Sequence, residues 1–289
     1  MQHTMAAGDA ADSCAPFKLF MPDELLVPLL ISAPHCGTQL TYEFRQNATS
    51  DEVLKVPDTD WFVHQLYDFA NELNIPLIHA VYSRYIIDLN RPLPGGAALY
   101  NNTVRTTGLV PLNTFSGKPI YKPGCEPTEA QIDARAERYH QPYYNKISKI
   151  LNELQQKFGV AMLYDGHSIL GQVEAIQSEP FVDYMPANRS GLTCPNVFIA
   201  KAQQIIAQHG ATCIANGPFQ GGNITRHFHD ADKSIFSFQM EISQRIYMNE
   251  QTGEKQQPNW SHTVVILREI IENFASMLLE IANSRQEIK

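Results

Sequence analysis

This sequence of 289 residues lacks several features that would point to particular classes of protein. It has no run of about 18 apolar residues, so no membrane-spanning helix is expected. Its five cysteines are an odd, scattered number without a C-x-x-C pair, which argues against a disulfide framework or zinc knuckle. It also lacks the H-E-x-x-H motif of helical zinc proteases. Reduced thiols and no membrane contact predict a cytoplasmic location.

Positive charge is also scarce, because 22 Lys and Arg face 30 Asp and Glu, for a net charge of −8. A nucleic-acid binder needs a basic face, so no nucleic-acid partner is expected. The content of 44% apolar and 18% charged residues is that of a globular protein rather than a disordered one. We expect a flexible lead-in over residues 1–20, whose start lacks the regions of a signal peptide, and a single domain over residues 21–289.

Apolar periodicity predicts alternating strands and helices. Buried strands are expected at 25–32, 76–81, 85–89, 160–164 and 234–241, with a weaker one at 212–215. Helices are expected after residues 57–59, from the capping box of Thr128 and Gln131 to about Phe158, over 196–208, and from Ser261 to about Ala282. Residues 92–124 and 171–194 are expected as long loops. This order predicts an α/β fold with a mixed or mostly parallel sheet flanked by helices.

Three polar residues, His35, His167 and Glu241, stand at or just beyond the ends of predicted strands. Ligands of α/β sheets bind beyond the carboxyl ends of the strands. Asp58 and Asp60 lie near the start of the next predicted helix. Two histidines and one carboxylate form a common ligand set for a catalytic zinc with an open position for water. The pattern therefore suggests a metal site, with Glu241 as the group that takes a proton from that water.

Each of these residues also has a structural interpretation. A histidine after a strand is often a hydrogen-bonded structural group, and Asp58 and Asp60 would both suit a helix start. Glu241 would reach Arg245 one turn further on. Cys36 is disfavoured as a lone nucleophile, because its neighbours better suit a metal site.

Arginines form a second group, with Arg84 and Arg91 flanking residues 85–90 and Arg226 ending the segment GGNITR at 221–226. Arginine binds a carboxylate through two parallel hydrogen bonds. These residues therefore suggest a small anionic substrate. The alternative is that Arg84 pairs with Asp88 and that Arg226 is a surface charge.

Several motifs together carry a family resemblance. They are SAPHCGT (32–38), DTDW (58–61) with LYDF (66–69), SRYIIDLNRP (83–92), TTGL (106–109) through PIY (119–121), GGNITRH (221–227), and Glu241 followed by YMNE (247–250). Over about residues 25–280 the chain resembles the N-formylglutamate amidohydrolases, the deformylases of histidine breakdown.

The resemblance implies a single-domain, zinc-peptidase-like (phosphorylase/hydrolase-like) α/β fold. It also implies hydrolysis of N-formyl-L-glutamate to L-glutamate and formate, with Zn²⁺ or another divalent ion as cofactor. By resemblance, the metal ligands are His35, His167 and one aspartate of the pair Asp58 and Asp60, of which Asp60 is favoured. The general base is Glu241, and the candidate substrate-binding residues are Arg84, Asn90, Arg91 and Arg226.

Three segments depart from the family pattern. Gly166 stands where alanine is expected after the aspartate, residues 188–191 read NRSG instead of Asn-Leu-Gly-Thr, and residues 226–229 read RHFH instead of a Tyr-Gly ending. The last two bear on substrate choice, and His227 or His229 offers an additional proton carrier. Two other functions remain open: hydrolysis of another N-acyl amino acid or peptide-type amide, and binding of an acidic metabolite without catalysis.

Overall fold

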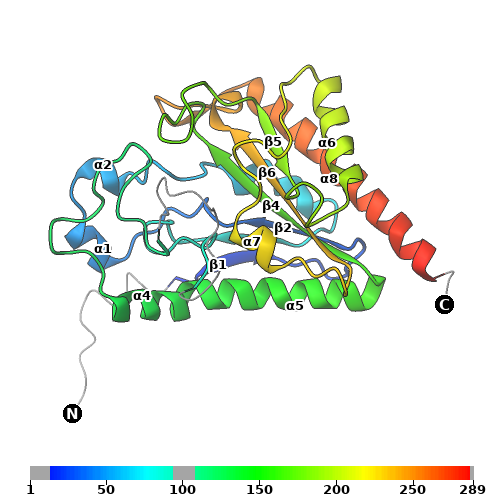
Figure 1. Cartoon of the computed structure of the whole chain (residues 1–289), viewed down its shortest axis with the longest axis horizontal. Coiled ribbons are helices and arrows are strands. Elements are labelled where there is room, and N and C mark those ends of the chain that lie inside the picture. Colours follow the sequence, from blue (N-terminus) through cyan, green and yellow to red (C-terminus); the bar gives the residue numbers. More distant parts are fainter. Residues whose placement is uncertain (1–13, 94–107, 287–289) are drawn as a thin grey trace, which may run out of the picture.

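The computed structural model describes residues 14–93 and 108–286 and contains a six-stranded mixed sheet in the order β1-β3-β2-β4-β6-β5 (Figure 1). The strands are β1 (Phe17–Phe20), β2 (Leu29–Ala33), β3 (Leu77–Ala80), β4 (Ala161–Ile169), β5 (Tyr184–Ala187) and β6 (Ile235–Ser243). The four central strands are parallel, and the two edge strands β1 and β5 are antiparallel to their neighbours. This is the α/β mixed sheet that the sequence predicts.

Helices cover both faces of the sheet. The α-helices are α1 (Tyr42–Asn47), α2 (Asp51–Leu54), α3 (Val63–Leu66), α4 (Glu129–Arg135), α5 (Gln141–Phe158), α6 (Asn196–Gln208), α7 (Asn223–His227) and α8 (Asn259–Gln286). Two short 3-10 helices are η1 (Asp68–Asn71) and η3 (Gln244–Ile246), and η2 (Ala136–His140) is a turn of π-helix. Strand β7 (Met248–Asn249) pairs with β8 (Glu254–Lys255). In Figure 1, α5 runs along one side of the sheet, whereas α6 and α8 lie on the other.

Two buried clusters form the core, one on each face of the sheet. On β2, Leu29 and Ile31 pack in the cluster that contains residues of α3, α6 and α8, whereas Leu30 packs in the cluster of α5. Side chains alternate along a strand, so adjacent residues serve opposite clusters. Because helices cover both faces of the sheet, the central strands have apolar side chains on both faces and do not alternate between apolar and polar residues.

The predicted helices are confirmed where the sequence has a capping box or a regular helical period of apolar residues. Thr128 and Gln131 form the expected capping box, and helical structure continues from α4 through the π-turn η2 to the end of α5 at Phe158. Helix α6 has the expected bounds, Asn196–Gln208. Helix α8 is slightly longer at both ends than expected. Among the described residues, no helix combines the length and apolar character needed to cross a membrane.

Other expectations were wrong. Residues 85–89 are not a strand but a buried turn segment, and residues 212–215 make only a single bridge, between Tyr184 and Cys213. The helix expected after 57–59 is broken into α3 and η1, and neither Asp58 nor Thr59 caps it, because α3 starts after Phe62. Residues 17–20, placed in the expected lead-in, form β1 instead.

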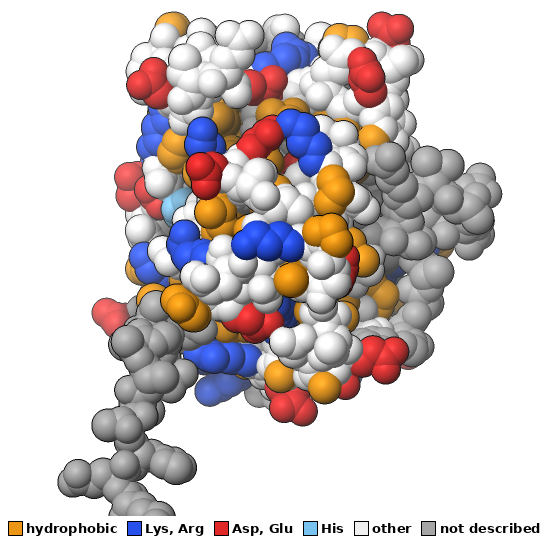
Figure 2. Space-filling model, turned by 90° about the vertical axis from the view of Figure 1, so that its left-hand side faces the viewer, with side chains coloured by type: hydrophobic (Ala, Val, Ile, Leu, Met, Phe, Trp, Pro, Cys, Tyr) orange, Lys and Arg blue, Asp and Glu red, His pale blue; other side chains and the backbone are white. Residues whose placement is uncertain are grey.

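The loop regions also differ in detail from the sequence prediction. The loop expected at 171–194 contains β5, and the one expected at 92–124 is described only outside residues 94–107. Thr106 and Thr107 of the family segment lie outside the described residues. On the face turned toward the viewer in Figure 2, the coloured Lys and Arg side chains are interspersed with Asp and Glu.

We expect Gly166→Ala to lower the free energy of unfolding by about 1–3 kcal/mol, because it overpacks the core. A Cβ at Gly166 would lie 2.7 Å from Cε2 of Tyr67, a fully buried ring whose hydroxyl donates to Tyr164. Urea denaturation measures the change. Gly108→Ala is the control, because within the described part of the chain a Cβ at this exposed position comes no nearer than 3.8 Å to another atom. Equal losses in both variants would contradict the prediction.

Candidate active site

The sheet register brings the expected polar residues together at the carboxyl ends of the central strands. In the parallel pair of β4 and β6, His167 is the register partner of Glu241. His35 lies in the turn directly after β2, which neighbours β4. His167 and Glu241 lie inside their strands rather than after them, because β4 and β6 continue to Ile169 and Ser243. Gly166, which precedes His167, is therefore part of strand β4.

His35, Asp60 and His167 form a buried group with the spacing of a metal site. One ligand atom from each side chain lies within 4.8 Å of the others. The Nδ1 atoms of His35 and His167 face the same oxygen, Oδ2 of Asp60, at 3.8 and 3.1 Å. The backbone N–H of Asp60 also donates to the carbonyl of His35 (3.1 Å), which ties the two loops together.

A second pair of carboxylates holds the outer nitrogens of both histidines. Nε2 of His35 lies 2.7 Å from Asp88, and Nε2 of His167 lies 2.9 Å from Asp165. Asp165 in turn accepts a hydrogen bond from the hydroxyl of Ser32 (3.0 Å). Metal-binding histidines commonly donate their second ring N–H to a carboxylate, which leaves the other nitrogen free for the ion. The donor set and its supporting carboxylates therefore fit Zn²⁺, which takes imidazole and carboxylate ligands.

The structure separates the two candidate aspartates. Asp58 accepts hydrogen bonds from the hydroxyl of Tyr85 (2.7 Å) and the backbone N–H of Phe115 (2.8 Å), so it fastens the loop at 115 to the segment after Ser83. Asp60 faces the two histidines. The arrangement favours Asp60 over Asp58 as the carboxylate of the metal group.

Asp88 is the important residue that sequence reasoning missed as part of the site. It is fully buried, contacts His35, and forms an ion pair with Arg84 at 2.8 Å. It also accepts the backbone N–H of Asn90 (2.9 Å). The sequence signal was present as the i, i+4 spacing of Arg84 and Asp88, but the apolar residues around Asp88 suggested a strand. The pairing of Arg84 with Asp88 is the alternative that the sequence left open.

Asn90 connects this network to α7, which carries Arg226. Its Nδ2 lies 3.2 Å from Nε2 of His167, and its Oδ1 accepts the backbone N–H of Ile224 (2.8 Å). A Cβ at Gly222 would overlap the Asn90 amide, which explains the glycine at this close approach. Arg91 follows Asn90 and is half-buried, as is Arg226. Both arginines thus stand on segments fixed directly by Asn90.

The two additional histidines differ in position. His227 ends α7 and packs edge-on against Tyr144, with ring centroids 5.0 Å apart. His229 lies at the opposite end of β6, where its Nδ1 is 3.1 Å from the carbonyl of Ile235. His229 therefore lies far along the sheet from Glu241, so of the two histidines only His227 stays a candidate proton carrier. The alternative pairing of Glu241 with Arg245 is not observed, because Arg245 pairs with Asp183 (2.8 Å).

Burial and neighbouring charges set the protonation of the group. The pKa of Glu241 is raised to about 8, mainly by burial; the charge of His167 opposes this rise and that of Asp60 adds to it. Burial alone would lower the pKa of His167, but Asp165 and Asp60 raise it well above its usual value. A proton on His167 thus supplies positive charge among the carboxylates, and a bound cation would take over this role.

Burial raises the pKa of the Cys36 thiol, so Cys36 does not have the properties of a free nucleophile.

We expect metal-free wild-type protein to lose stability relative to Glu241→Gln as the pH rises from about 5 to about 8. The unfolded carboxyl group ionises near pKa 4.5, whereas in the folded protein its pKa is about 8. The raised pKa stabilises the fold while the group stays protonated, and this contribution is lost as pH rises through the folded pKa. Glutamine does not ionise, so the variant lacks this loss. Urea denaturation of both proteins across this range measures the difference, and a constant difference would argue against the assignment.

Comparison with known proteins agrees with this architecture. Residues 27–248 match the sequence profile of the N-formylglutamate amidohydrolase family. The chain is 37% identical over 225 residues to an N-formylglutamate deformylase of Pseudomonas putida, covering 78% of this chain and 83% of the relative. It is 35% identical over 249 residues to an N-formylglutamate deformylase of Pseudomonas aeruginosa, covering 86% and 92%.

Solved structures share the fold. The crystal structure of an N-formylglutamate amidohydrolase from Ralstonia eutropha has a TM-score of 0.77 at 24% identity, covering 96% of this chain and 100% of that chain. A gene product of Agrobacterium tumefaciens has a TM-score of 0.66 at 16% identity, covering 96% and 98%. The profile match over most of the chain and the identities above 30% establish that this chain belongs to the N-formylglutamate amidohydrolase family.

Proposed function

We propose that this protein is a zinc-dependent amidohydrolase that cleaves N-formyl-L-glutamate to L-glutamate and formate. The observation that carries the proposal is the convergence of both histidine Nδ1 atoms on Asp60, beside Glu241 in the register of β4 and β6. The names of the Pseudomonas relatives support the choice of substrate. In this assignment, His35, Asp60 and His167 hold the ion.

The bound Zn²⁺ would supply positive charge that acidifies a water molecule, polarises the formyl oxygen and favours the ionised form of Glu241. Glu241 accepts the proton of the attacking water at its carboxylate. It then donates that proton to the glutamate nitrogen as the C–N bond breaks, so one group serves as base and then as acid. Asp88 and Asp165 keep the rings of His35 and His167 oriented throughout, through the hydrogen bonds described above.

The arginines divide into two roles in this scheme. Arg84 is buried and engaged with Asp88, and it lies 3.9 Å from Asp60, so it positions the carboxylates of the site. Arg91 and Arg226 are half-buried on the two segments that Asn90 fixes, and they are the proposed ligands of the substrate carboxylates. Asn90 is a positioning residue that keeps these segments against His167.

The direct test is formate release from N-formylglutamate by purified protein of known zinc content. We expect activity to follow the zinc content and to be lost on removal of the metal. Glu241→Gln should retain zinc but lower kcat by about 10²-fold or more, the usual contribution of a general acid–base group. Full activity in metal-free protein contradicts the metal assignment, and an active Glu241→Gln variant places the base elsewhere.

Substrate selection by the arginines gives a separate prediction. N-formylglutamine is an isostere of N-formylglutamate that keeps the α-carboxylate but has a neutral side chain, so the ratio of kcat/KM for N-formylglutamate to that for N-formylglutamine reports binding of the side-chain carboxylate. Loss of a charge-assisted hydrogen bond costs roughly 1.5–3 kcal/mol, so Arg91→Ala or Arg226→Ala should lower kcat/KM for N-formylglutamate about 10- to 100-fold. A variant that has lost the contact to the side-chain carboxylate has a lower ratio of kcat/KM for N-formylglutamate to kcat/KM for N-formylglutamine. A variant that has lost the contact to the α-carboxylate has a lower kcat/KM for both substrates by a similar factor.

Arg45→Ala is the matched control, because Arg45 is exposed on α1. It should leave both rates unchanged. If Arg91→Ala and Arg226→Ala both leave the preference for N-formylglutamate intact, the side-chain carboxylate is bound by other residues. A panel that includes N-acetyl- and N-succinylglutamate, together with equilibrium binding, tests the broader amidohydrolase and the non-catalytic alternatives.

A further inference from the structure

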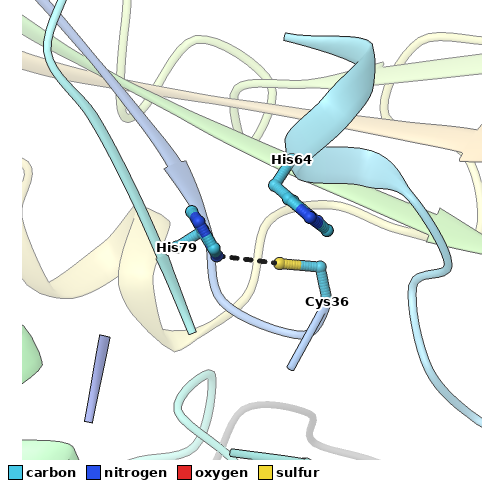
Figure 3. Close-up of side chains that lie close together, drawn as sticks. All are labelled: Cys36, His64 and His79. Carbon is cyan, nitrogen blue, oxygen red and sulfur yellow. Dashed lines mark hydrogen bonds between the residues drawn. The ribbon is translucent and has the colours of Figure 1, made fainter. Parts of the chain in front are cut away.

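A second group of metal-ligating side chains lies on the other face of the sheet. Cys36 comes from the turn after β2, His64 from α3 and His79 from β3, and Figure 3 shows the three side chains directed toward one another. His79 follows Ile78 on β3, and Ile78 packs in the α5 cluster, so His79 faces the side that α3 covers. Asp165 and His167 have the same strand parity as Leu163, which belongs to the α5 cluster. The two groups are therefore on opposite faces and share no residue.

The donor atoms are close enough to converge on one ion. One donor atom of each residue lies within 4.8 Å of the others, and Sγ of Cys36 is 3.8 Å from Nδ1 of His79. The imidazole rings of His64 and His79 are stacked, with centroids 4.6 Å apart. Cys36 is buried, whereas both histidines are half-buried, so an ion has access from solvent.

One buried nitrogen in this group has no hydrogen-bond partner. Nδ1 of His64 is shielded from solvent and makes no hydrogen bond within the described part of the chain. Leaving a buried polar atom without a hydrogen-bond partner is destabilising. A cation bound by Nδ1 would remove this cost. This is an observation independent of the clustering itself.

The local charges also favour neutral imidazole. Burial, together with the charges of His79, Lys18 and Lys255, lowers the pKa of His64 to about 4. His64 is therefore unprotonated at neutral pH and has a free lone pair. The lysines repel a cation as well, and this limits the affinity of the site, but Lys18 is exposed and its charge is screened by water.

We propose that Cys36, His64 and His79 bind a second, thiophilic divalent cation of the Zn²⁺ class. One thiolate and two imidazoles are ligands of Zn²⁺ and copper and not of Mg²⁺ or Ca²⁺, which require oxygen ligands. On binding, a metal–Sγ bond forms and the thiol proton passes to solvent. The thiol's present hydrogen bond to the carbonyl of Ala33 (3.3 Å) is given up.

Such an ion would connect the two segments that carry the proposed catalytic ligands. Cys36 directly follows His35, and His64 lies four residues after Asp60. The second ion would therefore link these segments on the face of the sheet opposite His35, Asp60 and His167. This role in positioning depends on the proposed function, whereas the existence of the second site does not.

Cobalt substitution distinguishes the two sites by their ligands. Metal-free, full-length protein is titrated with Co²⁺ in the absence of oxygen and followed by absorption spectroscopy. A Co²⁺ ion bound by His35, Asp60 and His167 has no sulfur ligand, whereas one bound by Cys36 shows a thiolate-to-cobalt charge-transfer band in the near ultraviolet. We expect two ions per chain and one such band.

Matched variants assign the band. Cys36→Ser should remove it and leave one bound ion, and His64→Gln and His79→Gln, which retain the thiol, should each raise the Co²⁺ concentration needed for half-maximal band intensity at least about tenfold. Cys213→Ser is the control and should retain the band, because Cys213 is far from the group on the bridge to β5.

Two results overturn the proposal: a wild-type protein that binds Co²⁺ without the charge-transfer band, or a band that survives Cys36→Ser. Circular dichroism of each variant verifies that it is folded, and the histidine variants test the site if Cys36→Ser does not fold. Formate release by the zinc-loaded wild type is measured in parallel. Activity without the band rejects the second site alone, whereas the band without activity rejects the proposed function alone.

Discussion

The contacts of the Asp60 carboxylate with both His35 and His167 are the interactions on which the arrangement of side chains at this end of the sheet depends. The carboxylate lies between two imidazoles, almost without exposure to water, and its Oδ2 atom also accepts the backbone N–H of Ser168. A buried charge is costly unless it is paired and hydrogen-bonded. The surrounding residues meet this requirement in layers: histidines around Asp60, carboxylates behind the histidines, and Arg84 behind Asp88.

Because of this layering, residues behind the two histidines support the geometry of the site. Asp88 orients His35 and neutralises Arg84, and Asp165 orients His167 while Ser32 holds Asp165. A ring held by a carboxylate at one nitrogen keeps the other nitrogen aimed at a fixed point. The site is therefore preorganised by the protein, and the energy that maintains it comes from the packed sheet that excludes water around these charges.

The turn after β2 serves both faces of the sheet. His35 faces the group at Asp60, and the next residue, Cys36, faces His64 and His79 on the opposite side. Gly37 allows this turn to lie against the backbone at Tyr82, where a Cβ would overlap the main chain. Two chemically distinct groups are thus built from adjacent residues, one rich in carboxylate and one with a soft thiol donor.

Short-range sequence patterns predict many of the strands and helices of this fold. The capping box at Thr128, the helical period over 196–208 and the buried strands around 160–164 and 234–241 depend on neighbours a few residues apart, and they were predicted well. Residues 85–89 form a buried turn and not the predicted strand, because an apolar run reports burial and not strand geometry. Edge strand β1 was missed because an edge strand is short and only partly buried.

The amino-acid sequence by itself determined the family, the residue types of the site and the alternation of strands and helices. Only the tertiary structure decided that Asp60 and not Asp58 faces the histidines, that Asp88 supports His35, and that Cys36 meets His64 and His79. These outcomes depend on contacts between segments far apart in the chain, such as Asp60 with His167. The register of parallel strands and the packing on each face of the sheet set these contacts, and local sequence does not encode them individually.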